Sequence, residues 1–149
     1  ALKLFKEAYF HLPSPKIHTR IALCYKWLGN NLKALEHYER YLKLAKEKGL
    51  QDKERVLIAK VKIEVKNLLI LIGQLRVIIE KPAEAEIRVN GKLVGKSPMN
   101  KLIRLQPGSV NVTAMRKGYY AFRRDVEVRP GGATKVSITL VSKDKFLWL

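Results

Sequence analysis

Residues 61–98 read VKIEVKNLLILIGQLRVIIEKPAEAEIRVNGKLVGKSP, and the spacing of their apolar residues changes at Gly73. Before Gly73, apolar residues recur every three or four positions, which is typical of one face of a helix. After it, apolar and polar residues alternate, and Asn90-Gly91 is a typical hairpin turn because both positions need positive φ. The sequence therefore predicts an α+β chain of two domains, a helical one over 1–73 and a β domain over 74–142, followed by a linker over 143–149.

Three helices are predicted upstream of this stretch, over 1–12, 16–28 and 31–48. Gly29 and Gly49 follow the second and third and can end them in the left-handed region. Residues 51–72 are ambiguous, because the run 61–66 also alternates like a strand. We predict one long helix there, since no turn signal interrupts the run and Gly73 supplies a stop.

Short alternating runs follow Gly73 at intervals of about ten residues, separated by Gly and Pro. This rhythm predicts a small seven-stranded antiparallel β-sandwich. Besides the hairpin at Asn90-Gly91, the clearest predicted strands cover 75–80, 85–89, 102–105, 110–114, 122–128 and 136–140.

The chain is strongly basic, with a net charge of +17 from 30 Lys and Arg against 13 Asp and Glu. The excess is spread over both predicted domains, so it is not a basic tail, and it attracts anions in general. Cys24 is the single cysteine, which excludes an intrachain disulfide and a thiol metal cluster. The start at Ala1 and the apolar end at Phe146–Leu149 suggest a segment of a longer protein.

No catalytic, cofactor-binding or metal-binding residues are predicted. The three histidines are His11, His18 and His37, and none is spaced from another like a zinc-binding pair. Cys24 lies on an apolar helical stripe with no orienting base in view. Glu84 and Glu86 share the polar, solvated face of a predicted strand, whereas general acid catalysis needs a buried carboxyl group. We therefore expect a protein that is not an enzyme.

A repeat with an offset of 33 residues relates the first and third predicted helices. It pairs Ala1 with Ala34 and Phe5 with Tyr38. With these residues in place, 1–73 resembles the end of a tetratricopeptide array, an α-solenoid of stacked helical hairpins. Its signature positions fall on His18, Ile21, Ala22, Tyr25, Gly29, Ala34, Tyr38 and Tyr41.

The β half resembles the PEGA domain. The motifs that carry the resemblance are Pro82-Ala83-Glu84-Ala85, Val89-Asn90-Gly91-Lys92, Val94-Gly95-Lys96-Ser97-Pro98, Leu105-Gln106-Pro107-Gly108, Lys117-Gly118-Tyr119 and Val128-Arg129-Pro130-Gly131. Glu84 stands where the family has Gly, so we expect different dihedrals there. Together the two resemblances imply a bacterial envelope protein, periplasmic or on the surface, with a membrane anchor beyond Leu149.

The tetratricopeptide resemblance implies a concave groove that holds a segment of a partner protein. The candidate groove residues are Lys16, Arg20, Leu23, Lys26 and Trp27. Their cations favour acidic or peptide partners, and an exposed Trp27 would be an anchor. The predicted function is protein binding and scaffolding, with the sandwich as a spacer or adhesion surface.

A basic and aromatic patch on the sandwich supports two alternative functions. Its candidate residues are Arg116, Lys117, Tyr120, Arg123 and Arg124. An exposed Tyr120 among cations could stack on a sugar, so an envelope glycan is one alternative partner, and an anionic lipid surface is another. A nucleic-acid-binding protein is supported by charge alone, because no recognition helix or aromatic platform is evident.

Overall fold

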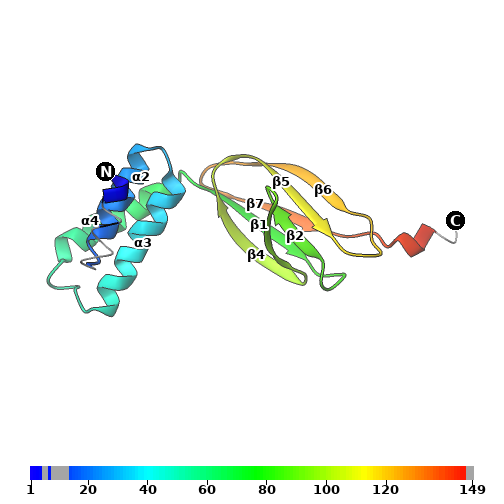
Figure 1. Cartoon of the computed structure of the whole chain (residues 1–149), viewed down its shortest axis with the longest axis horizontal. Coiled ribbons are helices and arrows are strands. Elements are labelled where there is room, and N and C mark those ends of the chain that lie inside the picture. The colour runs from blue at the N-terminus through cyan, green and yellow to red at the C-terminus, as the bar shows by residue number, and fades with distance from the viewer. Residues whose placement is uncertain (5–6, 8–13, 147–149) are drawn as a thin grey trace. The chain divides into compact units, whose positions relative to one another are not determined.

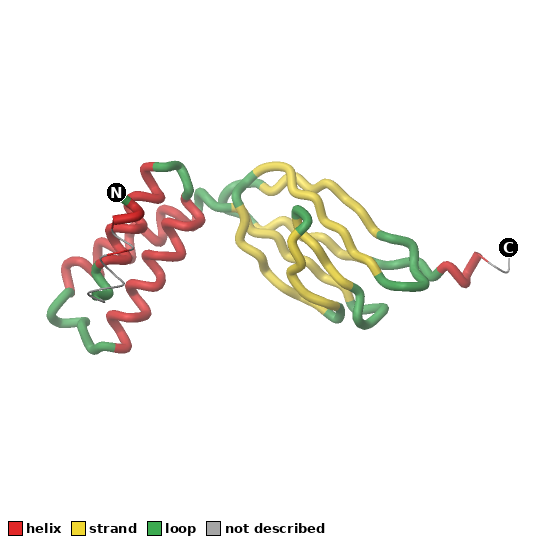
Figure 2. The backbone as a smooth tube through the Cα atoms, in the orientation of Figure 1, coloured by secondary structure: helices red, strands yellow, loops and turns green. Residues whose placement is uncertain are grey.

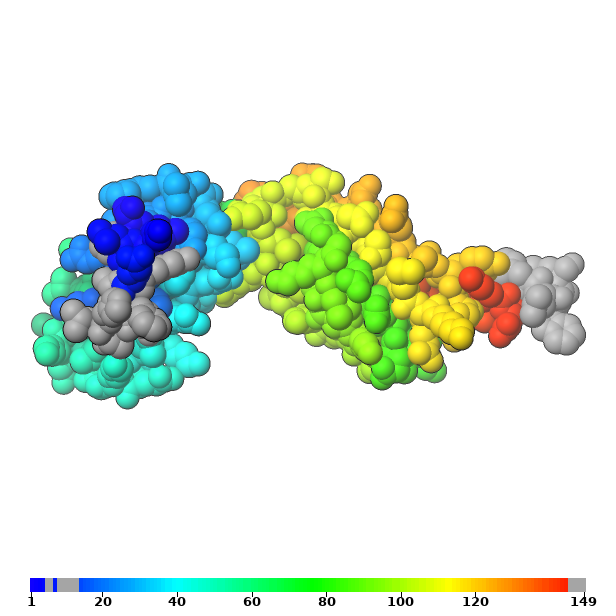
Figure 3. Space-filling model, in the orientation of Figure 1, coloured from blue at the N-terminus to red at the C-terminus, as the bar shows by residue number. Residues whose placement is uncertain are grey.

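The computed structural model describes residues 1–4, 7 and 14–146. The chain divides into two compact units, Ala1–Ile72 and Gly73–Leu149, which we call the helical unit and the sandwich unit. The first is built from helices and the second from strands (Figures 1 and 2). Side chains fill the space between the ribbons of each unit (Figure 3).

The described helices are α2 (Ile17–Trp27), α3 (Asn31–Glu47) and α4 (Arg55–Leu69). The predicted helices over 16–28 and 31–48 are confirmed, and the helical choice for 51–72 is right in kind. The helix α4 ends at Leu69, however, so Gly73 does not stop it and is instead the first residue of a strand. The predicted helix over 1–12 lies mostly outside the described residues.

The turn between α2 and α3 follows the capping chemistry of its two residues. Gly29 adopts a left-handed φ of 79° after the last turn of α2. The side chain of Asn30 accepts a hydrogen bond from the backbone N–H of Lys33 at 3.1 Å and so caps α3. The two helices therefore run back along each other as a hairpin.

Small and aromatic side chains pack the helical unit. Ala22 and Ala34 are fully buried and allow α2 and α3 to approach closely, and α3 also packs against α4. Tyr38 and Tyr41 on α3 fill the space between the helices. α3 therefore packs against both other helices, and the ion pair of Lys26 with Glu64 joins α2 to α4.

Seven strands form the sandwich unit. They are β1 (Gly73–Ile79), β2 (Glu86–Val89), β3 (Lys92–Lys96), β4 (Met99–Leu105), β5 (Gly108–Met115), β6 (Phe122–Val128) and β7 (Ala133–Ile138). One sheet has the order β4-β1-β7, and the other has the order β3-β2-β5-β6. The predicted sandwich is therefore confirmed, and the hairpin turn has the expected positive φ at Asn90 and Gly91.

One pairing differs from the prediction of an antiparallel sandwich. β1 pairs with β4 in the antiparallel direction but with β7 in parallel, with Val77 opposite Val136. The two strands are far apart in the sequence, and the chain reaches β7 from β6 in the other sheet. Alternation predicts strands but not the direction of such a distant partner, so the wholly antiparallel prediction is wrong.

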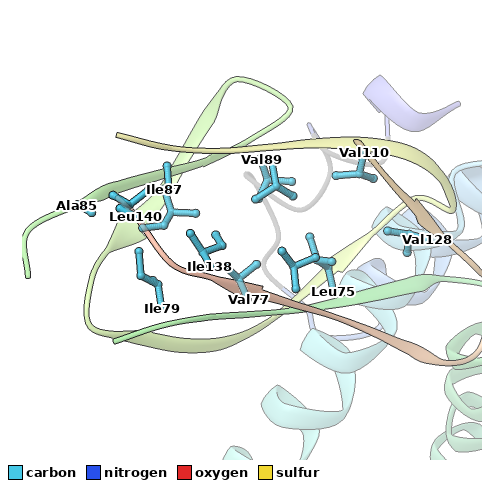
Figure 4. Packing of buried hydrophobic residues seen from close by; sticks show 13 residues of the cluster. Leu75, Val77, Ile79, Ala85, Ile87, Val89, Val110, Val128, Ile138 and Leu140 are labelled. Atoms are coloured by element: carbon cyan, nitrogen blue, oxygen red, sulfur yellow. The ribbon is translucent and has the colours of Figure 1, made fainter. Parts of the chain in front are cut away.

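The core of the sandwich lies between the inward faces of the two sheets. Leu75, Val77 and Ile79 of β1 are fully buried, and Figure 4 shows them pointing into the same space as Ile87 and Val89 of β2. Because side chains alternate along a strand, the residues between these buried ones point to the outer face of each sheet.

The loop before β2 is fixed by a buried serine. The backbone N–H of Ala85 donates to Ser97 Oγ at 2.8 Å, and the Ser97 hydroxyl donates to the carbonyl of Pro82. Glu84 in this loop has a left-handed φ of 64°. Glu84 therefore adopts a conformation that glycine favours and other residues rarely adopt, and a difference from the family's dihedrals stays a prediction.

Candidate functional site

A groove of about 600 Å³ lies between α2 and α4 of the helical unit. Lys16, Arg20, Leu23 and Lys26 line its α2 side, so four of the five candidate groove residues come together there. They recur every three or four positions and share one face of α2. The tetratricopeptide resemblance implied a groove with these residues, but the opposite wall could not be predicted, because the long-range packing of α4 is not visible in the sequence.

The α4 wall consists of Leu57, Lys60, Val61, Ile63 and Glu64. Val61 is buried, whereas Ile63 is 60% exposed at the rim, opposite Leu23, which is 37% exposed. Both rims of the groove therefore offer apolar contacts to a ligand.

The charges of the groove are predominantly positive. Its lining holds four cations, Lys16, Arg20, Lys26 and Lys60, and one acid, Glu64. Lys26 Nζ lies 2.7 Å from a carboxylate oxygen of Glu64, so this acid is paired within the groove. The lining of the groove therefore carries a net positive charge.

Trp27 does not line the groove. It is the last residue of α2 and follows Lys26, whose ion pair with Glu64 lies at the limit of the lining. The side chain is 76% exposed. The helical stripe gives the face of a residue but not where the groove ends along the helix, and the contact of Trp27 with a partner stays a prediction.

The floor of the groove is held by α3. Tyr38 lines the groove, and burial, followed by the charge of Glu64, raises the pKa of its phenol. Nearby, the hydroxyl of the buried Tyr41 donates to Glu54 at 2.7 Å, and Lys16 Nζ lies 3.8 Å from the same carboxylate. Burial, then this hydrogen bond, raises the pKa of Tyr41. Both phenols therefore stay neutral and act as structural groups.

Two histidines meet on the α2–α3 interface. The Nδ1 atoms of His18 and His37 are 3.1 Å apart, their rings stack, and Tyr25 stacks on the other side of His37. Burial lowers the pKa of His18 to about 4. This contact could not be predicted because the two residues are on different helices. No group of three metal-ligating side chains exists among residues 1–4, 7 and 14–146.

The candidate residues on the sandwich do not form one patch. Arg116 and Lys117 line a hollow of about 490 Å³ together with Glu84, Glu86 and Lys143. The lining of this hollow therefore contains three cations and two carboxylates. The glycan and nucleic-acid alternatives stay predictions.

The other three candidates are separated by strand geometry and by their own contacts. Tyr120 is 49% exposed, and the ammonium of Lys143 lies 5.7 Å from its ring centre. Arg123 is opposite Thr113 on the outer face of β6, whereas Arg124 lies over the ring of Phe122 at 5.4 Å. Consecutive strand residues point to opposite faces, so this pair could not serve one surface.

A family comparison covers the second unit. Its match begins in β1 and ends beyond β7, at residues 75–144. The sandwich matches the PEGA domain. The PEGA resemblance read from the motifs is therefore confirmed for these residues, whereas the tetratricopeptide resemblance of 1–73 stays a prediction. A comparison with curated proteins finds no match for the chain.

The PEGA motifs lie at the turns and loops that connect the strands. Asn90-Gly91 makes the β2–β3 turn, and Ser97 ties the loop before β2. Gly118 has a φ of 88° and precedes Tyr119, which packs against the core. The PEGA motifs thus shape turns and loops of the sandwich, and Gly118 and Tyr119 also line the hollow of about 490 Å³. Within the described part of the chain, no helix is long and apolar enough to cross a bilayer.

Proposed function

We propose that the chain is a non-enzymatic recognition module whose α2–α4 groove holds an acidic, partly apolar segment of a partner protein. The helical unit would be the end of a tetratricopeptide array, and the PEGA sandwich would be a spacer or second contact surface. The observation that carries the proposal is the lining itself, in which four cations surround an apolar strip and the single acid is already paired.

The chemistry of the lining defines the partner. Leu23 and Ile63 on opposite rims would contact apolar side chains of the bound segment, while Arg20 and Lys60 would pair with its carboxylates. Such charges speed the encounter and favour acidic over basic segments. The apolar contacts would supply most of the affinity.

The proposed cellular location of the chain rests on the PEGA match of the sandwich. PEGA domains occur in extracytoplasmic proteins. We propose the same for this chain, as part of the cell envelope. A domain with one cysteine and no disulfide is compatible with that setting.

A peptide titration tests the groove. The probe is a fluorescent amphipathic helical peptide with Leu on one face and Glu on the other, and its counterpart carries Lys in place of Glu. Fluorescence anisotropy with the full chain should show saturable binding of the acidic peptide and a dissociation constant at least about tenfold weaker for the basic one.

The double variant Leu23→Ser/Ile63→Ser should weaken binding of the acidic peptide about tenfold or more, because it removes apolar contacts at both rims. The matched control is Leu93→Ser on β3, a similarly exposed leucine in the sandwich unit. Equal affinity of the double variant and the wild type would rule out the groove as the binding site.

A further inference from the structure

The outer face of the three-stranded sheet contains no acidic residue. Its nine positions alternate with the residues of β4, β1 and β7 that face the other sheet. Three are cations, Ile78 and Leu102 are large aliphatic residues, and the rest are small or neutral polar residues. We call this surface the basic face, and it consists of Gln74, Arg76, Ile78, Asn100, Leu102, Arg104, Ala133, Lys135 and Ser137.

The cations of the basic face are close together. Arg76 on the central strand is opposite Lys135 on β7, and Arg104 is a diagonal neighbour on β4. Like charges on directly opposed residues of neighbouring strands destabilise a sheet. Arg76 donates to the neutral side chain of Asn100 at 2.7 Å, which leaves its charge uncompensated by that contact. An external anion would relieve this repulsion.

The other sheet arranges its charges differently. All three acidic residues inside strands, Glu86, Asp125 and Glu127, belong to the four-stranded sheet. There Arg88 lies 3.7 Å from Glu86, and Arg123 shares the outer face of β6 with both of that strand's acids. Within its strands, the sandwich therefore has one face of mixed charge and one face whose charged residues are all cations, and the acid Glu80 directly follows β1 beside Ile78 and Ser137.

We propose that the basic face lies against the anionic lipid headgroups of a bilayer. A sheet face that carries cations on all three of its strands suits a planar anionic partner, and Leu102, 41% exposed among the cations, would enter the boundary between headgroups and acyl chains. None of the nine residues is aromatic, so the face lacks the rings on which bases or sugars stack. Charge complementarity and this composition favour lipid over nucleic acid or glycan.

The expected strength of binding to an anionic membrane follows from the number of cations on the basic face. Each Lys or Arg held near an anionic membrane surface raises the partition coefficient about fivefold. Three cations on one face therefore account for about a hundredfold preference for anionic over neutral vesicles, and the effect fades with salt.

Vesicle co-sedimentation of the full chain tests the proposal. One set of vesicles is pure phosphatidylcholine, and the other contains about 30% phosphatidylglycerol to supply the negative surface. The variant Arg76→Gln/Arg104→Gln/Lys135→Gln removes three charges from the basic face. The control Arg88→Gln/Lys96→Gln/Arg123→Gln removes the same number from the four-stranded sheet.

The wild type should bind the anionic vesicles and not the neutral ones. The basic-face variant should lose at least about tenfold in partition coefficient, and the control should change by less than about threefold. Equal losses in both variants would overturn the proposal, because net charge alone would then explain binding. Retention of the wild type on heparin or duplex DNA but not on the anionic vesicles would overturn it as well.

Folding of each variant is checked by circular dichroism. Should the triple variant unfold, Lys135→Gln alone serves in its place, because an exposed lysine on an edge strand tolerates substitution. Its expected loss is about fivefold, against no measurable change for Arg123→Gln. The absence of that difference would count against the proposal in the same way.

Discussion

At the scale of single residues, Ser97 illustrates how a motif position acts through hydrogen bonds. Its side chain is buried, accepts from the backbone of Ala85 and donates to the carbonyl of Pro82. A buried backbone group that loses its partner costs about 1–3 kcal/mol. Ser97 therefore stabilises the loop that leads into β2.

We expect Ser97→Ala to lower the free energy of unfolding of the sandwich by about 1–3 kcal/mol, because two buried backbone groups lose their partner. Urea unfolding of the full chain, followed by circular dichroism in the strand region, measures this. Ser109→Ala, at an exposed position of β5, is the control and should change little. A loss no larger than that of the control would refute the role given to Ser97.

Glu84 is strained at a position where glycine is better suited. An L-residue in the left-handed region costs about 1–2 kcal/mol, which exceeds the entropic cost of glycine, about 0.5–1 kcal/mol. Glu84→Gly should therefore stabilise the sandwich by about 0.5 kcal/mol, as measured by the urea midpoint. Glu86→Gly, inside β2, should destabilise it, and a stabilising effect of both substitutions would contradict the argument.

His18 makes the helical unit sensitive to acid. Its pKa falls from 6.5 in the unfolded chain to about 4 in the fold, first because of burial and then because of the charges of His37 and Arg40. Between these values the unfolded chain binds more protons. The free energy of unfolding therefore falls as the pH drops through this window, by at most about 1.4 kcal/mol per pH unit.

The sign of this pH dependence can be checked with urea titrations at pH 7 and pH 5, in which the helical circular dichroism signal reports unfolding. The midpoint of the wild type should be lower at pH 5. His18→Gln cannot be protonated, so the difference between the two pH values should shrink. A variant with the wild-type pH dependence would show that His18 is not the responsible group.

At the scale of elements, features that depend on neighbouring residues could be predicted, whereas contacts between residues far apart in the sequence could not. Asn30 caps α3 and Asn90-Gly91 turns β2 into β3, because both effects depend on neighbouring residues. The parallel pairing of β1 with β7 and the meeting of His18 with His37 depend on residues far apart in the sequence. The same distinction applies to the groove, whose α2 wall was predicted and whose α4 wall was not.

Gly73 shows how one element can be misassigned by a sound local rule. Glycine ends many helices, yet here a Cβ would collide with the side chain of Val128 across the start of β1. Gly73→Ala should therefore destabilise the sandwich by about 1–3 kcal/mol, as overpacking does. Gly132→Ala, where a Cβ meets nothing, is the control. Equal urea midpoints for the two variants would show that the close approach is unimportant.

At the scale of the whole molecule, each unit has a buried cluster of its own. The helical cluster centres on Leu35, Tyr41 and Leu68, and the sandwich cluster on Leu75, Ile87 and Val112. The change of apolar spacing at Gly73 predicted this division, since the two kinds of surface bury their residues differently.

We therefore expect residues 73–149 to fold without the helical unit. A sandwich of this size buries a modest apolar area, so its stability should be low but its unfolding cooperative. A single sigmoidal thermal transition of the fragment would agree with this expectation. A fragment without a transition and with the spectrum of an unfolded chain would contradict it.

The claim that the helical unit recognises an acidic segment through its groove is tested most directly by nuclear magnetic resonance. The full chain, labelled at its Leu, Val and Ile methyl groups, is titrated with the acidic amphipathic peptide. We predict that the largest shifts belong to Leu23, Leu57, Val61 and Ile63, which line the groove. Largest shifts in the sandwich, or none at millimolar peptide, would contradict the account.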